Sequence, residues 1–256
     1  MIPLHSLPPL VRVRVLHRPS KIIKSPYVAD VVLDSGEEAL CHTPGLGCSG
    51  LVAPGRILYV SRATNNSAKT DYTAQVAECE DSEGAYYVGI HPMVSQAMAG
   101  RLLDKVHPEV TWRSEVKVDT HTRMDFVGTV ASGKKVYVEV KNAMISHQTH
   151  VERSSRRAVF PEGYRKVKTD TFSPRALKHA ELLGDLVGRE DTEAAYLVYI
   201  VPRHDCQDGL ELHSQDPVYG QGVTEAMASG VQVRVFGLHV DADQISFDRP
   251  LPFHAP

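Results

Sequence analysis

The sequence predicts an α/β protein, α+β overall, in which a small β-barrel precedes a mixed sheet flanked by helices. Residues 1–90 hold several short strand-like runs separated by turns, and they show no helical period. From residue 91 onward, helix-like and strand-like segments alternate. Of the 256 residues, 42 % are hydrophobic and 23 % are charged, as in ordinary globular proteins. We therefore predict two domains, residues 1–90 and residues 91–256.

The first domain is expected to consist of short strands. Residues 11–16 read Val-Arg-Val-Arg-Val-Leu, which alternates as a half-buried strand does, and residues 27–33 form a β-branched run. Three further strands are expected at residues 57–60, 72–77 and 86–90, each after a turn or a polar loop. Strands this short, at this spacing, predict a small barrel.

The second domain is expected to open with a helix at His91-Pro92, because apolar residues recur at helical spacing up to Leu102. The elements expected after it are, in order, strands at residues 112–119, 123–130 and 135–141, a helix at 173–188, a buried strand at 194–201, a helix at 218–229 and a final strand at 231–236. Ser173 is the expected N-cap of the second helix, and Gly230 is the expected end of the third.

Composition excludes several classes of protein. No stretch approaches the roughly 18 consecutive apolar residues of a membrane helix, and the first nine residues lack the pattern of a signal peptide. Four scattered cysteines argue against a disulfide scaffold and favour a reducing compartment, so we expect a cytoplasmic location. The formal net charge of −3 excludes a uniformly basic nucleic-acid binder, so any basic surface must be local.

A predicted hairpin at residues 123–141 carries the most informative charges. Ala131-Ser132-Gly133 suits a three-residue loop, and pairing of the residues that flank this loop places Asp125 opposite Glu139. Opposed side chains on one sheet face have Cβ atoms about 4.5–5.5 Å apart. Lys141 lies two residues after Glu139 and points to the same face. The register decides this arrangement, because a shift of one residue would separate the two carboxylates.

Two facing carboxylates repel each other unless a cation neutralises them, and Mg²⁺ prefers such oxygen ligands. A metal and a lysine together suit phosphodiester hydrolysis, in which the metal polarises the phosphate and the lysine stabilises the developing charge. The alternative interpretation is a solvated polar face on an amphipathic hairpin.

Short blocks over nearly the whole chain carry a family resemblance. The blocks are Pro8-Pro9-Leu10, Ala29-Asp30-Val31, His42-Thr43-Pro44, Ser114-Glu115-Val116-Lys117, Arg123-Met124-Asp125-Phe126, Val138-Glu139-Val140-Lys141, Phe160-Pro161, Lys178-His179 and Arg249-Pro250-Leu251-Pro252. In this order and spacing, the chain resembles the sugar fermentation stimulation protein A family. The resemblance implies an OB-like barrel followed by a PD-(D/E)XK, restriction-endonuclease-like domain, and a DNA-binding protein with a regulatory role in sugar metabolism.

The resemblance also implies roles for individual residues. Asp125 and Glu139, with the carbonyl of Val140, are the expected ligands of Mg²⁺ or Mn²⁺, while Lys141 and Glu115 complete the catalytic set. The resemblance further implies that four basic residues orient a carboxylate or contact phosphate, namely Arg123, Arg175, Lys178 and His179.

Two local runs of basic charge favour DNA as the partner. The first run precedes Asp30 and the second follows the hairpin, and the residues expected to contact DNA are Arg12, Arg14, Arg18, Lys21, Lys24, Arg153, Arg156 and Arg157. Binding through such runs weakens steeply with salt. Nothing marks direct base readout, so we expect binding without sequence preference; the alternative is solvated loop charge.

Several questions stay open at the level of sequence. The first hypothesis is a metal-dependent nuclease, the second is a regulator that binds DNA without cleaving it, and RNA is a third, weaker possibility as a partner. The oligomeric state has no clear signature, and a homodimer is one option. Structural zinc is not expected, because the nearest groups lack paired zinc-ligand spacing: Cys41-His42 with Cys48, His147 with His150, and His204 and Cys206 with His213.

Overall fold

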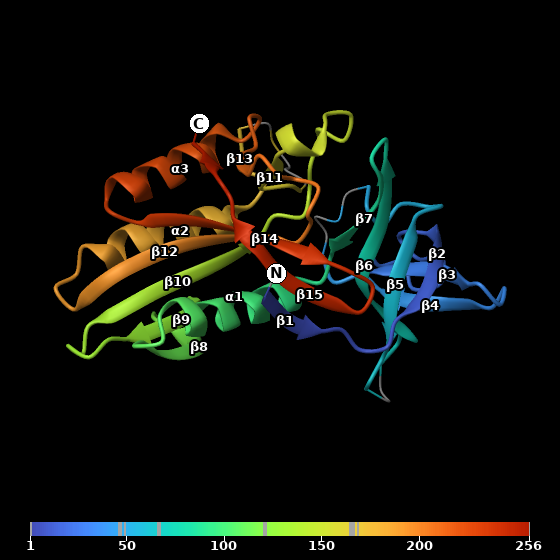
Figure 1. The fold of residues 1–256 in the computed structure, drawn as a ribbon, viewed down its shortest axis with the longest axis horizontal. Helices are drawn as coiled ribbons and strands as arrows, with labels where there is room; N and C mark the ends of the chain where they lie inside the picture. The colour runs from blue at the N-terminus through green and yellow to red at the C-terminus, as the bar shows by residue number, and fades with distance from the viewer. Residues whose placement is uncertain are drawn as a thin grey trace.

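A computed structural model describes residues 2–45, 48, 50–65, 68–119, 122–163, 167 and 169–255. A small ring of strands lies at one end of the molecule and a large sheet covered by helices at the other (Figure 1). Among the described residues, no helix is both long and apolar enough to cross a membrane. All four cysteines are buried and free.

The ring is a six-stranded sheet that closes on itself. Its strands are β2 (Val11–His17), β3 (Val28–Leu33), β4 (Glu38–His42), β5 (Ile57–Arg62), β6 (Tyr72–Asp81) and β7 (Gly84–Gly89). They lie in the order β4-β3-β2-β5-β6-β7, and a parallel pairing of β4 with β6 closes the barrel. Alternate residues such as Val13, Val31 and Leu58 fill its core. This ring confirms the expected OB-like barrel.

The large sheet has seven strands. They are β1 (Ile2–Ser6), β8 (Thr111–Lys117), β9 (Arg123–Thr129), β10 (Lys135–Asn142), β12 (Thr192–Val201), β14 (Gln232–Val240) and β15 (Gln244–Pro250). Their order is β1-β15-β14-β12-β10-β9-β8, with β10, β12 and β14 parallel to one another. A smaller parallel sheet holds β11 (Ala158–Phe160), β13 (Leu210–Leu212) and β16 (Phe253–His254).

Three helices cover the large sheet on its two faces (Figure 1). α1 (Pro92–Val106) packs Met98 and Leu102 against Val138 of β10 on one face. α2 (Pro174–Val187) and α3 (Pro217–Ala228) pack on the other face. Ser173 caps α2 as predicted, because its hydroxyl accepts a hydrogen bond from the Ala176 N–H at 3.3 Å. The expected mixed sheet flanked by helices is therefore confirmed.

The chain ends depart from the sequence-based expectation. The strand expected to be last, β14, is followed by β15 and β16. Moreover, β1 pairs antiparallel with β15 in the large sheet. Residues 2–6 therefore lie outside the barrel, although the predicted first domain of residues 1–90 includes them. Such a pairing joins segments more than 200 residues apart, which periodicity along the chain does not reveal. The division near residue 90 otherwise stays a prediction.

Candidate functional site

The hairpin formed by β9 and β10 has the predicted register. Its pairs run from Thr129–Lys135 to Phe126–Val138, and Gly133 takes the left-handed conformation of the loop, with φ +88°. Beyond Phe126–Val138 the two strands part. There, Oδ2 of Asp125 accepts a hydrogen bond of 2.7 Å from the backbone N–H of Val140. The carboxylate therefore takes the place of a strand partner, rather than pairing across the sheet with Glu139.

Glu139 is the most buried acidic group of the site, with 3 % of its surface exposed. Its Oε1 contacts both Nζ of Lys141 and Nδ1 of His179, and these two nitrogens are 3.4 Å apart. Burial alone would raise the pKa of Glu139, but the hydrogen bond with His179 and the charge of Lys141 hold that pKa below its ordinary value. Oε2 is also buried, and it has no hydrogen-bond partner among the described residues.

Asp125 is held from its other side by helix α1. Nε2 of Gln96 donates to Oδ1 of Asp125 at 2.9 Å and to Oε1 of Glu115 at 2.6 Å, so one amide joins two carboxylates. Burial, and then the charge of Glu139, raise the pKa of Asp125 to about 6, although the Val140 N–H and Lys141 oppose them. The site therefore concentrates negative charge in a place with little water, which is where a divalent cation gains most.

Glu115 reaches Gln96 through an unusual backbone. Its φ is +53°, a left-handed conformation that costs a non-glycine residue free energy. The β8–β9 register continues on both sides, with Ser114 opposite Phe126 and Val116 opposite Met124, but Glu115 and Asp125 between them do not pair. Glu115 itself is exposed. The strained residue thus places an exposed carboxylate beside Asp125.

The structure brings the four predicted catalytic residues together and adds two further side chains. Asp125, Glu139, Lys141 and Glu115 lie at a single site with Gln96, which was not predicted, and with His179. No sequence pattern points to Gln96, because a polar residue on an amphipathic helix is ordinarily solvated. His179, expected as a phosphate contact, is 4 % exposed and lies against Glu139 inside the site.

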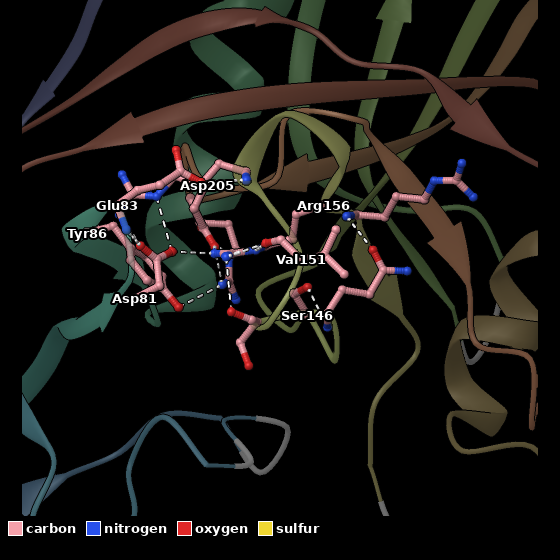
Figure 2. A network of polar contacts seen from close by, with 12 residues as sticks. Asp81, Glu83, Tyr86, Ser146, Val151, Arg156 and Asp205 are labelled. Atoms are coloured by element: carbon pink, nitrogen blue, oxygen red, sulfur yellow. Dashed lines mark hydrogen bonds and ion pairs between the residues drawn. The ribbon is translucent and has the colours of Figure 1, made fainter.

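Arg153 and Arg156 do not form a DNA-binding surface, which corrects the prediction. Arg156 is 1 % exposed, and its Nη1 lies 2.8 Å from Asp81 and 2.7 Å from Asp205 (Figure 2). Arg153 contacts the same Asp81 at 2.8 Å. Because Asp81 ends β6 of the barrel and Asp205 follows β12, these pairs fasten the barrel to the second unit. Because both guanidinium groups are little exposed and already paired with carboxylates, they are not free to contact DNA phosphates.

The other predicted basic residues are more accessible. Arg157 is one-third exposed and pairs with Asp208 at 2.6 Å. In the barrel, Arg12 pairs with Asp34 at 3.3 Å, and Arg18 donates to the carbonyls of Pro26 and Gly45. Six are exposed, and none of them pairs with a carboxylate of the described residues: Arg14, Lys21, Lys24, Arg123, Arg175 and Lys178. Their role at a nucleic-acid surface stays a prediction.

Comparison with known proteins places this geometry in context. The family model described as "Sugar fermentation stimulation protein RE domain" matches residues 91–244. A sugar fermentation stimulation protein homolog of Rhodospirillum centenum is 31 % identical over 231 residues, with 90 % of this chain and 92 % of the relative covered. A homolog of Dinoroseobacter shibae is 30 % identical over 248 residues, with 95 % and 93 % covered.

A solved structure has the same fold. The structure of Pyrococcus furiosus SfsA in complex with Ca²⁺ superposes with a TM-score of 0.77, covering 99 % of this chain and 100 % of that chain. The two sequences are 20 % identical, so the likeness concerns the fold alone.

Proposed function

The chain belongs to the sugar fermentation stimulation protein family, and we propose that it binds DNA and hydrolyses phosphodiester bonds with Mg²⁺ or Mn²⁺. The observation that carries this proposal is the convergence of Asp125, Glu139 and Lys141 where β9 and β10 part. Two carboxylates and an amine at one buried place suit phosphoryl chemistry better than a solvated sheet face does.

The carboxylates fit a divalent cation. Oε2 of Glu139 is buried without a hydrogen-bond partner among the described residues, and such an atom costs free energy, about 1–3 kcal/mol, unless something satisfies it. The raised pKa of Asp125, about 6, also reports negative charge in need of compensation. Asp125, Glu139 and the carbonyl of Val140 would hold the cation. The Ca²⁺ in the complex of Pyrococcus furiosus SfsA supports a divalent cation in this chain.

Each side chain then has a defined task. When bound, the cation polarises a phosphate oxygen and lowers the pKa of bound water. Lys141 supplies an ammonium next to Glu139, where it can stabilise negative charge on the phosphate. His179 holds Glu139 in place through Nδ1, and Gln96 fixes Asp125 relative to Glu115.

Exposed basic residues near the site would position the DNA backbone. Arg175 and Lys178 lie in the first turns of α2, the helix that also carries His179, and Arg123 begins β9. Contacts of this kind fix phosphates and read no sequence. We therefore propose binding without sequence preference.

A second candidate function is a regulator that binds DNA without cleaving it. One observation favours it: Lys141 and His179 both contact Oε1 of Glu139, so this carboxylate is already compensated by groups of the chain itself. In that case Lys141 would be a structural partner of Glu139 rather than a catalytic group.

Cleavage and binding measured in the same samples distinguish the two functions. Purified protein is incubated with single-stranded DNA, duplex DNA and RNA, in Mn²⁺, Mg²⁺ or EDTA. Glu139→Ala is the test variant, and Glu190→Ala, at an exposed position after α2, is the matched control. We expect metal-dependent cleavage by the unmodified protein and the control only. A salt-sensitive gel shift without cleavage, equal in all three proteins, would establish the regulator instead.

A further inference from the structure

Three side chains of metal-binding type meet at one edge of the small parallel sheet. Glu162 follows β11 and His213 follows β13, and these two strands are parallel neighbours with Phe160 opposite Leu212. The residues that follow neighbouring parallel strands lie at the same sheet edge. His147 joins them because Ile145 forms a bridge with Val159 of β11.

The distances among the three side chains suit a common ligand. Oε2 of Glu162 lies 3.1 Å from Nε2 of His147 and 3.9 Å from Nε2 of His213, and the three ligand atoms all lie within 4.8 Å of one another. Four ligands placed tetrahedrally around zinc, at bond lengths of about 2.0–2.1 Å, are roughly 3.3 Å apart. Small side-chain movements therefore complete the geometry.

Burial and charge at this edge favour a cation. Oε2 of Glu162 is buried and lies near the two imidazoles, but it forms no hydrogen bond within the described residues, and no lysine or arginine there pairs with this carboxylate. The side chain of His147 is 52 % exposed, while those of Glu162 and His213 are 19 % and 12 % exposed. An ion can thus enter past His147 and reach the two more deeply placed ligands.

We propose that His147, Glu162 and His213 bind a zinc ion, with water as the fourth ligand. Two imidazoles and one carboxylate suit zinc, whereas Mg²⁺ and Ca²⁺ prefer oxygen ligands alone. The site is separate from Asp125 and Glu139, and it does not depend on the proposed nuclease function. Its effect is to tie the long segment between β10 and α2, which carries His147 and Glu162, to β13.

One local hydrogen bond must be exchanged when zinc binds. The backbone N–H of Gln215 donates to Nδ1 of His213 at 3.1 Å, which turns Nε2 of that ring toward Glu162. Coordination through Nε2 leaves the ring proton on Nδ1, so the Gln215 amide has to turn away. The metal–nitrogen bond replaces this contact.

Zinc titration of the full chain tests the proposal. Protein stripped with a chelator is titrated with Zn²⁺, bound metal is counted by elemental analysis, and Co²⁺ absorption reports four-coordinate nitrogen and oxygen ligation. The variants are His147→Ala and Glu162→Gln, with His150→Ala as the matched control, since His150 is an exposed histidine of the same segment outside the cluster. Glu139→Ala controls for metal at the other site.

We expect the unmodified protein, His150→Ala and Glu139→Ala to bind one zinc ion that His147→Ala binds about 100-fold more weakly or not at all. Zinc should also raise the melting temperature of the first three proteins and not that of His147→Ala. The His147 side chain is half-exposed in the native chain, so His147→Ala should fold. An unchanged melting temperature of this variant without zinc verifies that it does. Equal zinc binding by His147→Ala and the unmodified protein, or no binding by either, would overturn the proposal.

Discussion

Val140 and Asp125 are joined by a hydrogen bond of 2.7 Å, in which the Val140 backbone N–H donates to Oδ2 of Asp125. The bond forms just beyond the Phe126–Val138 pair, where β9 and β10 stop pairing. It holds the carboxylate of Asp125 beside the strand that carries Glu139. Because the donor is a backbone group, the position of Asp125 depends on the path of the hairpin and not on one replaceable side chain.

Gln96 should act as a positioning residue. Gln96→Leu removes the amide that joins Glu115 and Asp125, so we expect Mn²⁺ affinity and cleavage rate to fall by about 10–100-fold. The free energy of unfolding should change little, because Gln96 is not one of the buried residues of α1. Met93→Ala, at an exposed position of the same helix, is the control. If Gln96→Leu keeps full Mn²⁺ affinity, the hydrogen bonds from Gln96 to Asp125 and Glu115 do not position the metal ligands.

The ion pairs of Asp81 with Arg153 and Arg156 should contribute to the stability of the fold at acid pH. Burial would raise the pKa of Asp81, but its hydrogen bonds with Arg153 and Arg156 outweigh burial and hold that pKa well below the ordinary value of 3.8. The native state therefore binds fewer protons than the unfolded state, so this stabilisation is complete above about pH 4 and is lost as the pH falls further.

Asp81→Asn should lower the free energy of unfolding at pH 7 by about 3–5 kcal/mol, because it leaves two buried or nearly buried guanidinium groups without this partner. The variant should also lose part of the acid-dependent decline below pH 4. Urea titrations at several pH values, with the exposed Asp104→Asn as control, measure both effects. Parallel pH profiles for Asp81→Asn and the unmodified protein would show that Asp81 does not carry the acid dependence.

Arg175 and Lys178 should contribute to DNA affinity through phosphate contacts. Replacing either with alanine should weaken binding equally for unrelated sequences and reduce the slope of log K against log salt by about 1. Fluorescence anisotropy across a salt series measures this slope, with Lys105→Ala at the end of α1 as the matched control. An unchanged slope in both α2 variants would move the DNA surface away from that helix.

The hairpin was the most predictable part of the site. A three-residue loop with Gly133 fixes the register locally, and the pairs up to Phe126–Val138 follow from it. Gln96 and His179 could not be placed in this way, because each meets its carboxylate only after a helix packs on the sheet. The prediction that Arg156 contacts DNA was wrong for a related reason. Its partners Asp81 and Asp205 are 75 and 49 positions away in the sequence. Charge along the chain does not show whether a tertiary partner will bury it.

Direct measurement of Mn²⁺ binding tests the central claim most closely. Two proteins are titrated with Mn²⁺, namely His147→Ala and the double variant His147→Ala with Glu139→Gln, while free Mn²⁺ is followed by electron paramagnetic resonance. The His147→Ala change in both keeps the second proposed site from contributing. A cation held by Asp125 and Glu139 predicts one bound Mn²⁺ that Glu139→Gln binds at least about 10-fold more weakly. Identical titrations for the two proteins would contradict the assignment of this site.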